Sequence, residues 1–221
     1  MRQSKRRPSQ TAMDIPEAYA EWSATYDSDR NLTRDLSYVV VRQTLENQHC
    51  KSILEIGCGT GNNTGLLAQI GKRVWAVDFS ACMLDLAREK LRLDNVSFTA
   101  ADLTKPWPCA KQSIDLIVCS LVLEHIRDLD FIFSEAFRVL APAGRFFICE
   151  LHPFRQYQGT RATFERAEQT IEIPAFVHHF SDFIDVAAVN CLSLESVREW
   201  WHDEDQNKLP RLVSFVFEKA G

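Results

Sequence analysis

The chain has 221 residues and a formal net charge of −5 at pH 7. Hydrophobic residues make up 46% and charged residues 25%, a globular composition with enough length for one α/β domain. The acidic balance argues against nucleic acid as the main partner, and no apolar run is long enough to cross a membrane. Seven cysteines, odd in number and without a CxxC pair, indicate buried free thiols and neither a disulfide framework nor a zinc site.

The only basic run stands at the start of the chain, with four cationic residues between positions 2 and 7. It lies in a polar stretch without an apolar period, so residues 1–13 are predicted to be a solvated, disordered tail. Because no apolar segment follows these charges, the run is not a secretory signal, and we expect a cytoplasmic protein. No repeat or linker divides the remainder, so residues 14–221 are expected to form one domain.

Helical and strand patterns alternate along most of that domain. One or two helices are expected within 14–47, and the later helices at 64–70, from a cap at Ser80 to about 91, at 130–140, and from a cap at Ser181 to about 190. The expected strands are 52–56, 73–77, 96–99, 114–119, 145–151, 192–200 and 212–217. This order predicts a doubly wound, mostly parallel, seven-stranded sheet. The last two strands follow each other without a helix, so one of them is expected to be antiparallel.

The first of four suggestive segments is the glycine-rich loop Glu55-Ile56-Gly57-Cys58-Gly59-Thr60-Gly61, which ends the first strand. In parallel sheets, ligands bind beyond the carboxyl ends of the strands. Glycines at alternate positions let the backbone turn sharply and approach a ligand closely. Asn62 stands where the dinucleotide fingerprint GxGxxG requires its third glycine, so that fingerprint is absent. An ordinary tight turn also uses glycine, so the loop alone decides nothing.

Acidic residues follow the next two strands. Asp78 lies near the distance from the glycine loop at which an acid binds ribose hydroxyls, although it can equally cap a helix. In Asp102-Leu103, the aspartate can accept from an exocyclic amine and the leucine can cover a purine face; the alternative is a surface turn. The fourth segment, residues 120–125, follows the fourth strand and can also be simply the start of a helix.

Together these motifs resemble the class I S-adenosylmethionine (SAM)-dependent methyltransferases, especially the small ones that act on free metabolites. The motif LEIGCGTG at 54–61 is followed in order by VDFS…ML at 77–84, AADL at 100–103, DLIVCSLVLEHI at 115–126 and FRVLAPAG at 137–144. The resemblance covers about residues 50–150 strongly and the rest loosely. It implies a Rossmann-like methyltransferase fold that binds SAM, releases S-adenosylhomocysteine and needs no metal.

The resemblance also implies donor contacts, which are Tyr26, Glu55, Gly57, Cys58, Gly59, Gly61, Asp78, Phe79, Met83, Asp102, Leu103 and Ser120. The three glycines would let the loop pass under the methionine part of SAM. Glu55 would fix that loop or reach the donor amine, and Ser120 would lie near the methionine and the acceptor. Tyr19 and Tyr26 resemble residues that close over the donor.

On the adenosine side, the resemblance implies that Asp78 holds the ribose hydroxyls. Asp102 would meet the adenine amine. Phe79, Met83 and Leu103 would pack around the adenine ring.

The acceptor side is expected to be built from residues 14–47 and from the insertion 152–180, which has no clear period. His152 and His178 are the candidate acid–base residues, because an imidazole titrates near neutral pH. His152 can also serve only to hold the insertion's backbone.

The leading functional prediction is methyl transfer to a small molecule through an oxygen, nitrogen or carbon atom. The arginines of the insertion favour the alternative of a carboxyl O-methyltransferase acting on a small acid. A non-catalytic SAM- or nucleotide-binding module is the third interpretation. No nucleic-acid or membrane partner is expected, and the protein is expected to be a monomer or homodimer.

Two positions depart from the family pattern. Ala143 stands where many relatives have glycine, and Asn190-Cys191-Leu192 lacks the usual glycine before the sixth strand. Both lie away from the donor loop, so they bear on packing and leave the expected donor contacts unchanged.

Overall fold

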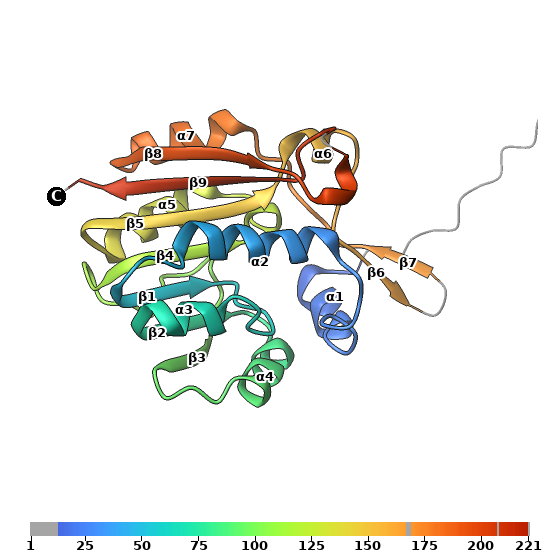
Figure 1. The fold of residues 1–221 in the computed structure, drawn as a ribbon, viewed down its shortest axis with the longest axis horizontal. Coiled ribbons are helices and arrows are strands. Elements are labelled where there is room, and N and C mark those ends of the chain that lie inside the picture. Colours follow the sequence, from blue (N-terminus) through green and yellow to red (C-terminus); the bar gives the residue numbers. More distant parts are fainter. Residues whose placement is uncertain (1–12, 167–168, 207, 221) are drawn as a thin grey trace, which may run out of the picture.

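The computed structural model describes residues 13–166, 169–206 and 208–220, and its core is a seven-stranded sheet (Figure 1). The strand order is β3-β2-β1-β4-β5-β9-β8, and β9 is antiparallel to both of its neighbours. The strands are β1 (Cys50–Ile56), β2 (Gly71–Asp78), β3 (Val96–Ala100), β4 (Ile114–Ser120), β5 (Leu140–Leu151), β8 (Leu192–Trp200) and β9 (Leu212–Lys219). The predicted doubly wound sheet with one antiparallel strand is confirmed.

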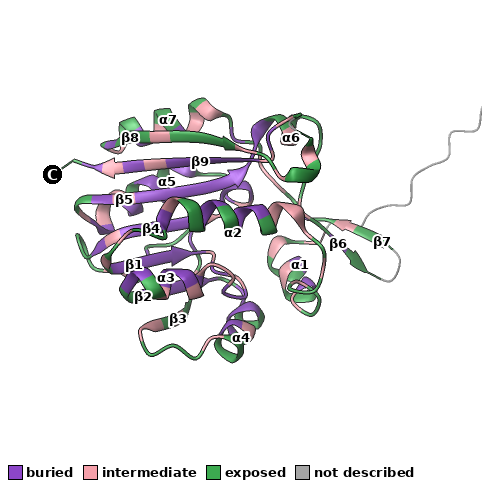
Figure 2. Ribbon diagram, in the orientation of Figure 1, coloured by how far each residue is buried: buried purple, intermediate pink, exposed green. Residues whose placement is uncertain are grey.

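Helices cover both faces of this sheet, and the central strands are buried between them (Figure 2). The helices on one face are α2 (Leu32–Leu45), α3 (Thr64–Ile70) and α4 (Ala81–Lys90); those on the other are α5 (Leu129–Val139) and α7 (Phe180–Val189). Continuous apolar strands such as β4 suit a sheet that is covered on both faces. Phe133 of α5 packs edge-on against Phe146 and Phe217 of the sheet, with ring centroids 5.4 Å apart in each case.

Most helix boundaries follow from capping residues. The Ser80 hydroxyl accepts from the Met83 amide at 3.4 Å and starts α4, as predicted. The prediction that Ser181 caps α7 is wrong, because the helix begins at Phe180 with His179 as its N-cap. Asp182 explains the earlier start, since its carboxylate accepts from the His179 amide at 2.7 Å.

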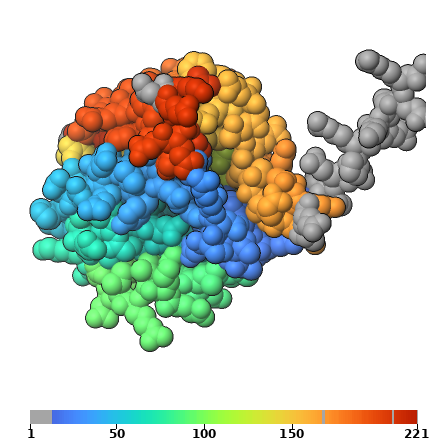
Figure 3. Space-filling model, turned by 45° about the vertical axis from the view of Figure 1, so that its right-hand side comes forward, coloured from blue at the N-terminus to red at the C-terminus, as the bar shows by residue number. Residues whose placement is uncertain are grey.

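Residues 152–180 form a short helix and a hairpin that their sequence pattern did not predict. These elements are α6 (Pro153–Tyr157), β6 (Thr163–Arg166) and β7 (Gln169–Glu172). The hairpin packs against α1 (Ile15–Trp22) through a small core of Ala18, Trp22, Phe164 and Ile173. In Figure 3, the blue N-terminal segment and the orange hairpin accordingly lie side by side. The insertion therefore completes a cover with α1 at the carboxyl edge of the sheet.

Both departures from the family pattern lie where the backbone is left-handed. Ala143 has φ 58° and Cys191 has φ 57°, a conformation that favours glycine. Cys191 and Cys82 are exposed, so the prediction of buried thiols is wrong for these two. The tail predicted for residues 1–13 lies, apart from Met13, outside the described residues. Within the described residues, no helix has the length and apolar character to cross a membrane.

Candidate functional site

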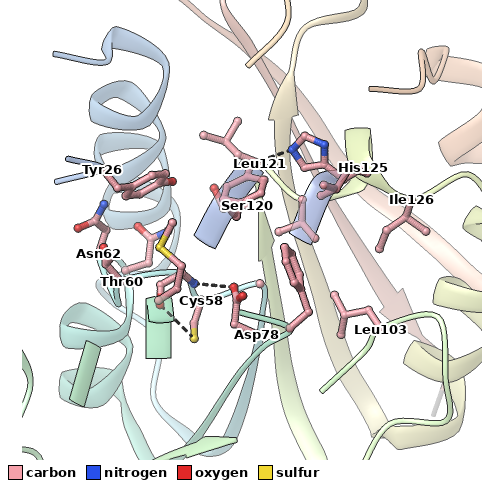
Figure 4. A pocket seen from close by; sticks show the side chains of 18 of the residues that line it. Tyr26, Cys58, Thr60, Asn62, Asp78, Leu103, Ser120, Leu121, His125 and Ile126 are labelled. Atoms are coloured by element: carbon pink, nitrogen blue, oxygen red, sulfur yellow. Dashed lines mark hydrogen bonds between the residues drawn. The ribbon is translucent and has the colours of Figure 1, made fainter. Parts of the chain in front are cut away.

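A cavity of about 430 Å³, called here the main cavity, opens at the carboxyl ends of β1, β2 and β4 (Figure 4). The predicted donor residues that line it are Tyr26, Gly57, Cys58, Gly59, Asp78, Phe79, Met83, Asp102, Leu103 and Ser120. Glu55 and Gly61 do not line it. A hollow of about 440 Å³ near the other end of the sheet, lined by Ala143, Arg145 and Glu195 among others, contains none of the predicted donor residues.

The three glycines of the loop after β1 have different functions in the fold. All have positive φ, 70° at Gly57, 53° at Gly59 and 82° at Gly61. A Cβ on Gly57 would lie 2.2 Å from a methyl carbon of Val122, and one on Gly61 would lie 2.8 Å from Leu91. A Cβ on Gly59 would meet no described atom within 4 Å. Gly57 and Gly61 therefore serve packing, whereas Gly59 leaves open space beside the cavity.

Asp78 joins the glycine loop to the end of β2. One carboxylate oxygen accepts from the Gly59 amide at 2.9 Å and the other accepts from the Ser80 amide at 2.8 Å. Burial raises the pKa of Asp78, while these amide hydrogen bonds act to lower it. Each oxygen keeps a further lone pair, so the side chain can still accept from two ligand hydroxyls.

Glu55 lies behind the loop. Its carboxyl group is buried and accepts from the Thr64 hydroxyl at 2.5 Å at the start of α3. Burial raises its pKa to about 8. Glu55 was predicted either to fix the glycine loop or to reach the donor amine, and this geometry supports the first role.

Comparison with known proteins agrees with this site. Residues 54–148 match the family described as "Methyltransferase domain". The matched domain and the fold together support a class I SAM-dependent methyltransferase.

Two curated relatives and one solved structure illustrate the similarity. The "Biotin biosynthesis bifunctional protein BioHC" of Cellvibrio japonicus is 32% identical over 85% of this chain and 38% of its own length. The "Demethylmenaquinone methyltransferase" of Tropheryma whipplei is 28% identical over 77% and 66%. The chain thus spans less than two thirds of either relative's length. The N-methyltransferase NodS of Bradyrhizobium japonicum, solved with S-adenosylhomocysteine, shares the fold at 18% identity, with a TM-score of 0.72 over 95% of this chain and all of that one.

The N-terminal segment is fastened across the glycine loop that follows β1. The Asp27 carboxylate accepts from the Thr60 hydroxyl at 2.6 Å and from the Lys90 ammonium at 2.9 Å. Partial burial raises the pKa of Asp27, but these two bonds outweigh it and hold the pKa below its usual value. Ser37 of α2 also hydrogen-bonds Ser120 at the end of β4. These contacts bring the predicted Tyr19 and Tyr26 to the cavity wall.

Several lining residues were not predicted as donor contacts. They are Ile15, Pro16, Arg34, Ser37, Thr60, Asn62, Asn63, Thr104, Leu121, Val122, His125 and Ile126. Thr60 and Val122 lie inside the quoted motifs, so the sequence could have identified them as site residues. Nothing in the sequence identified Arg34, because only the tertiary fold brings α2 to this edge of the sheet. Leu121 has φ 59°, an uncommon conformation for this residue type that recurs at functional sites.

Neither His152 nor His178 lines the main cavity. The His152 ring is fully buried, with Nε2 3.0 Å from a Glu199 oxygen and Nδ1 accepting from the Phe154 amide at 3.2 Å. A carboxylate only accepts, so Nε2 donates and both ring nitrogens are occupied. Burial lowers the pKa of His152 despite Glu199. These contacts support the structural interpretation, and a catalytic role stays an untested prediction.

His178 is likewise held by backbone groups. Its Nε2 lies 3.1 Å from the Leu123 carbonyl oxygen and 2.8 Å from that of Ile126, to which it donates. The ring therefore braces the segment after β4 from behind. As with His152, a catalytic role stays an untested prediction.

A second cavity of about 240 Å³, called here the side cavity, adjoins the main one. The two share Tyr19, Tyr26, Arg34 and Leu121 as lining residues. Residues 160–163 of the insertion line its far side. In the described part of the chain, no cluster of three or more His, Cys, Asp or Glu side chains is arranged to hold a metal ion.

Proposed function

We propose that the protein transfers the methyl group of SAM to a small-molecule acceptor and releases S-adenosylhomocysteine. The observation that carries the proposal is the main cavity, in which Asp78 and the glycine loop meet at the carboxyl ends of β1 and β2. The relatives agree with it, since one is a demethylmenaquinone methyltransferase and a structural neighbour was solved with S-adenosylhomocysteine. SAM brings its own leaving group, so the protein must align the acceptor and exclude water.

The lining residues suit the parts of SAM. Asp78 would accept from the ribose hydroxyls with its remaining lone pairs. The Thr104 amide and hydroxyl both bond Oδ1 of Asp102, and we assign Oδ2 to the adenine amine. Leu103 and Met83 would cover the adenine ring. The Arg34 guanidinium donates to the carbonyl oxygens of Tyr26 and Asp29, and we assign its charge to the methionine carboxylate.

Residues 14–47 and the insertion 152–180 together form the cover of the acceptor site in this proposal. Their support is the shared core of α1 and the hairpin, and the side cavity that both segments line. A cover of this kind excludes water from the transferred methyl group.

The carboxyl-methyltransferase alternative gains little from the insertion's arginines. Arg155 is paired at 2.8 Å with Asp205, whose side chain is 5% exposed, and Arg166 is paired with Glu21 at 2.6 Å. Arg161 lines the side cavity, but its side chain is 51% exposed. Methylation of a carboxylate therefore enters the tests below as an alternative outcome.

The proposal is tested first by calorimetry. One molecule of SAM is expected to bind per chain, and S-adenosylhomocysteine is expected to compete with it, because the two share every contact except the methyl group. Asp78→Ala is expected to weaken SAM binding by about 1–3 kcal/mol. Asp85→Ala, on an exposed position of α4, is the matched control. Since Asp78 also holds two backbone amides, the melting temperature of each variant is measured beside its affinity.

Catalysis is then separated from mere binding. The protein is incubated with methyl-tritiated SAM and a small-molecule extract of bacterial cells, and labelled products are separated by chromatography. A labelled product that depends on the protein supports the enzyme. SAM binding without any labelled product would leave a binding module and exclude the proposed enzyme.

A further inference from the structure

One tyrosine–histidine pair lies where the two cavities meet. The Tyr19 hydroxyl oxygen is 2.8 Å from Nε2 of His125, and both residues line the main cavity. Figure 4 labels His125 in the cavity wall. Tyr19 also lines the side cavity. Its ring contacts Phe79 edge-on, with centroids 5.8 Å apart, so it adjoins a residue assigned to the donor site.

The hydrogen bonds of His125 fix the direction of this pair. Nδ1 of the ring lies 3.0 Å from the carbonyl oxygen of Pro174. A carbonyl oxygen only accepts, so Nδ1 carries the ring proton and Nε2 presents its lone pair. The Tyr19 hydroxyl must therefore donate to Nε2. Its own lone pairs remain available to accept a hydrogen bond from a molecule in the cavity.

The surroundings keep Tyr19 protonated. Burial raises the pKa of Tyr19 well above its ordinary value, and the charges of Tyr26, Glu124, Asp78 and Glu150 raise it further. A neutral phenol that donates to an imidazole can relay a proton but does not itself act as a phenolate base. Glu124 lies beyond the pair, with a carboxyl oxygen 3.8 Å from Nε2 of His125. The Glu124 carboxyl group would therefore lie close enough to stabilise an imidazolium formed at His125.

We propose that Tyr19 and His125 form a proton relay for an acceptor hydroxyl, and that the acceptor of this enzyme is a hydroxyl compound that reaches SAM through the side cavity. This rests on the proposed function. The acceptor oxygen attacks the methyl carbon as the S–C bond breaks, and the electron pair of that bond stays on sulfur. The acceptor's proton passes to the Tyr19 oxygen while the Tyr19 proton passes to Nε2 of His125. The products are a methyl ether, S-adenosylhomocysteine and an imidazolium, which returns its proton to solvent.

Among oxygen and nitrogen acceptors, a hydroxyl is the class that needs this relay. A carboxylate is already ionised at neutral pH and has no proton to give. A neutral amine attacks with its lone pair and can lose its proton after the transfer. A phenol-type hydroxyl, with a pKa near 10, must lose its proton as it reacts, and a neighbouring imidazole contributes typically a hundredfold or more to such a step.

The test reads the chemistry of the labelled product and the behaviour of matched variants. With methyl-tritiated SAM and the bacterial extract, the expected product is a methyl ether, stable to mild alkali. Tyr19→Phe and His125→Asn are each expected to lower turnover about a hundredfold, to leave SAM affinity within about twofold, and to combine without further loss.

A second tyrosine–histidine pair provides the control. The Tyr157 hydroxyl lies 2.6 Å from Nδ1 of His179, but neither residue lines the main or the side cavity. Tyr157→Phe and His179→Asn are expected to keep normal turnover. A labelled ester that alkali hydrolyses to methanol, an N-methyl product, or normal turnover in Tyr19→Phe would overturn the relay while leaving the methyltransferase intact. If no labelled product forms at all, the proposed function fails with it.

Discussion

The proposed donor and acceptor sides of the site are built in different ways. The donor side takes most of its residues from positions 55–104, where backbone hydrogen bonds tie the loop after β1 to the end of β2. The acceptor side joins α1, the segment after β4 and the insertion, which are far apart in the sequence and meet through aromatic contacts. Trp22, for example, stacks on Phe164 with the ring centroids 5.8 Å apart.

This difference separates two kinds of specificity. In the proposed function, donor recognition resides in a short stretch of chain whose backbone is fixed by the strands that flank it. Acceptor recognition then resides in side chains that only the tertiary fold assembles. Changes to the donor side are therefore expected to affect the fold and SAM binding together, whereas changes to the cover are expected to affect binding or turnover with a smaller effect on stability.

The largest effect is expected at Gly57. Gly57→Ala places a Cβ 2.2 Å from Val122 in a left-handed backbone, and the strain and overpacking are expected to cost about 2–4 kcal/mol of unfolding free energy. Gly59→Ala, whose Cβ meets open space, is expected to cost only the backbone strain of about 1–2 kcal/mol and to weaken SAM binding more than it lowers stability. Urea denaturation and calorimetry on both variants test this. Equal stability losses would contradict the division of roles.

The next effect is a pH dependence of the donor side. Burial raises the pKa of Glu55 to about 8, against an ordinary value of 4.5. Between these two values the folded state holds a proton that the unfolded state has lost, so the free energy of unfolding falls as pH rises, by up to about 1.4 kcal/mol per pH unit. Burial also raises the pKa of Glu150 to about 8, so this residue makes the free energy of unfolding fall further over the same pH range. Glu55→Gln is expected to remove part of the fall, because its side chain cannot ionise.

Thermal melts between pH 5 and pH 8 measure this slope. Relative to wild type, Glu55→Gln should gain stability at pH 8 compared with pH 5. Glu89→Gln, at an exposed position near the end of α4, is the control and should follow the wild-type curve. An unchanged slope in Glu55→Gln would show that the carboxyl group is ionised in the folded protein.

On the cover, the expected effect is smaller. Asp27→Ala removes the acceptor for Thr60 and Lys90, and so loosens the N-terminal segment over the glycine loop. A loss of about 1 kcal/mol in SAM affinity, roughly fivefold to tenfold, is expected by calorimetry, with little change in melting temperature. The exposed Asp94→Ala serves as control. A large loss of stability without a loss of SAM affinity would show that the hydrogen bonds of Asp27 stabilise the fold and do not contribute to SAM binding.

The same contrast explains which features the sequence could predict. The doubly wound sheet with one antiparallel strand could be predicted, and most of the predicted donor residues line one cavity, because strand patterns and glycine turns are local. The hairpin β6–β7 did not, since its only buried strand residue, Phe164, packs on α1 and no alternation marks it. His125 lies inside the motif at 115–126, but the sequence could not show its contacts, because its partners Tyr19 and Pro174 lie far away in the sequence. His152 looked like a base for a local reason, its place after a strand, whereas Glu199 occupies its ring nitrogen.

The smallest effect is expected where neither side of the site is involved. Ala143 and Cys191 have φ near 58° and 57°, in which a side chain costs roughly 1–2 kcal/mol, while glycine adds about 0.5–1 kcal/mol of entropy to the unfolded chain. Ala143→Gly and Cys191→Gly are therefore each expected to raise stability by up to about 1 kcal/mol, or about 2–4 °C in melting temperature. The exposed Ala188→Gly, within α7, is the control and is expected to lower stability by about 0.5–1 kcal/mol. SAM affinity should stay unchanged in all three variants. A lower melting temperature in both Ala143→Gly and Cys191→Gly would mean that their side-chain contacts outweigh the backbone strain.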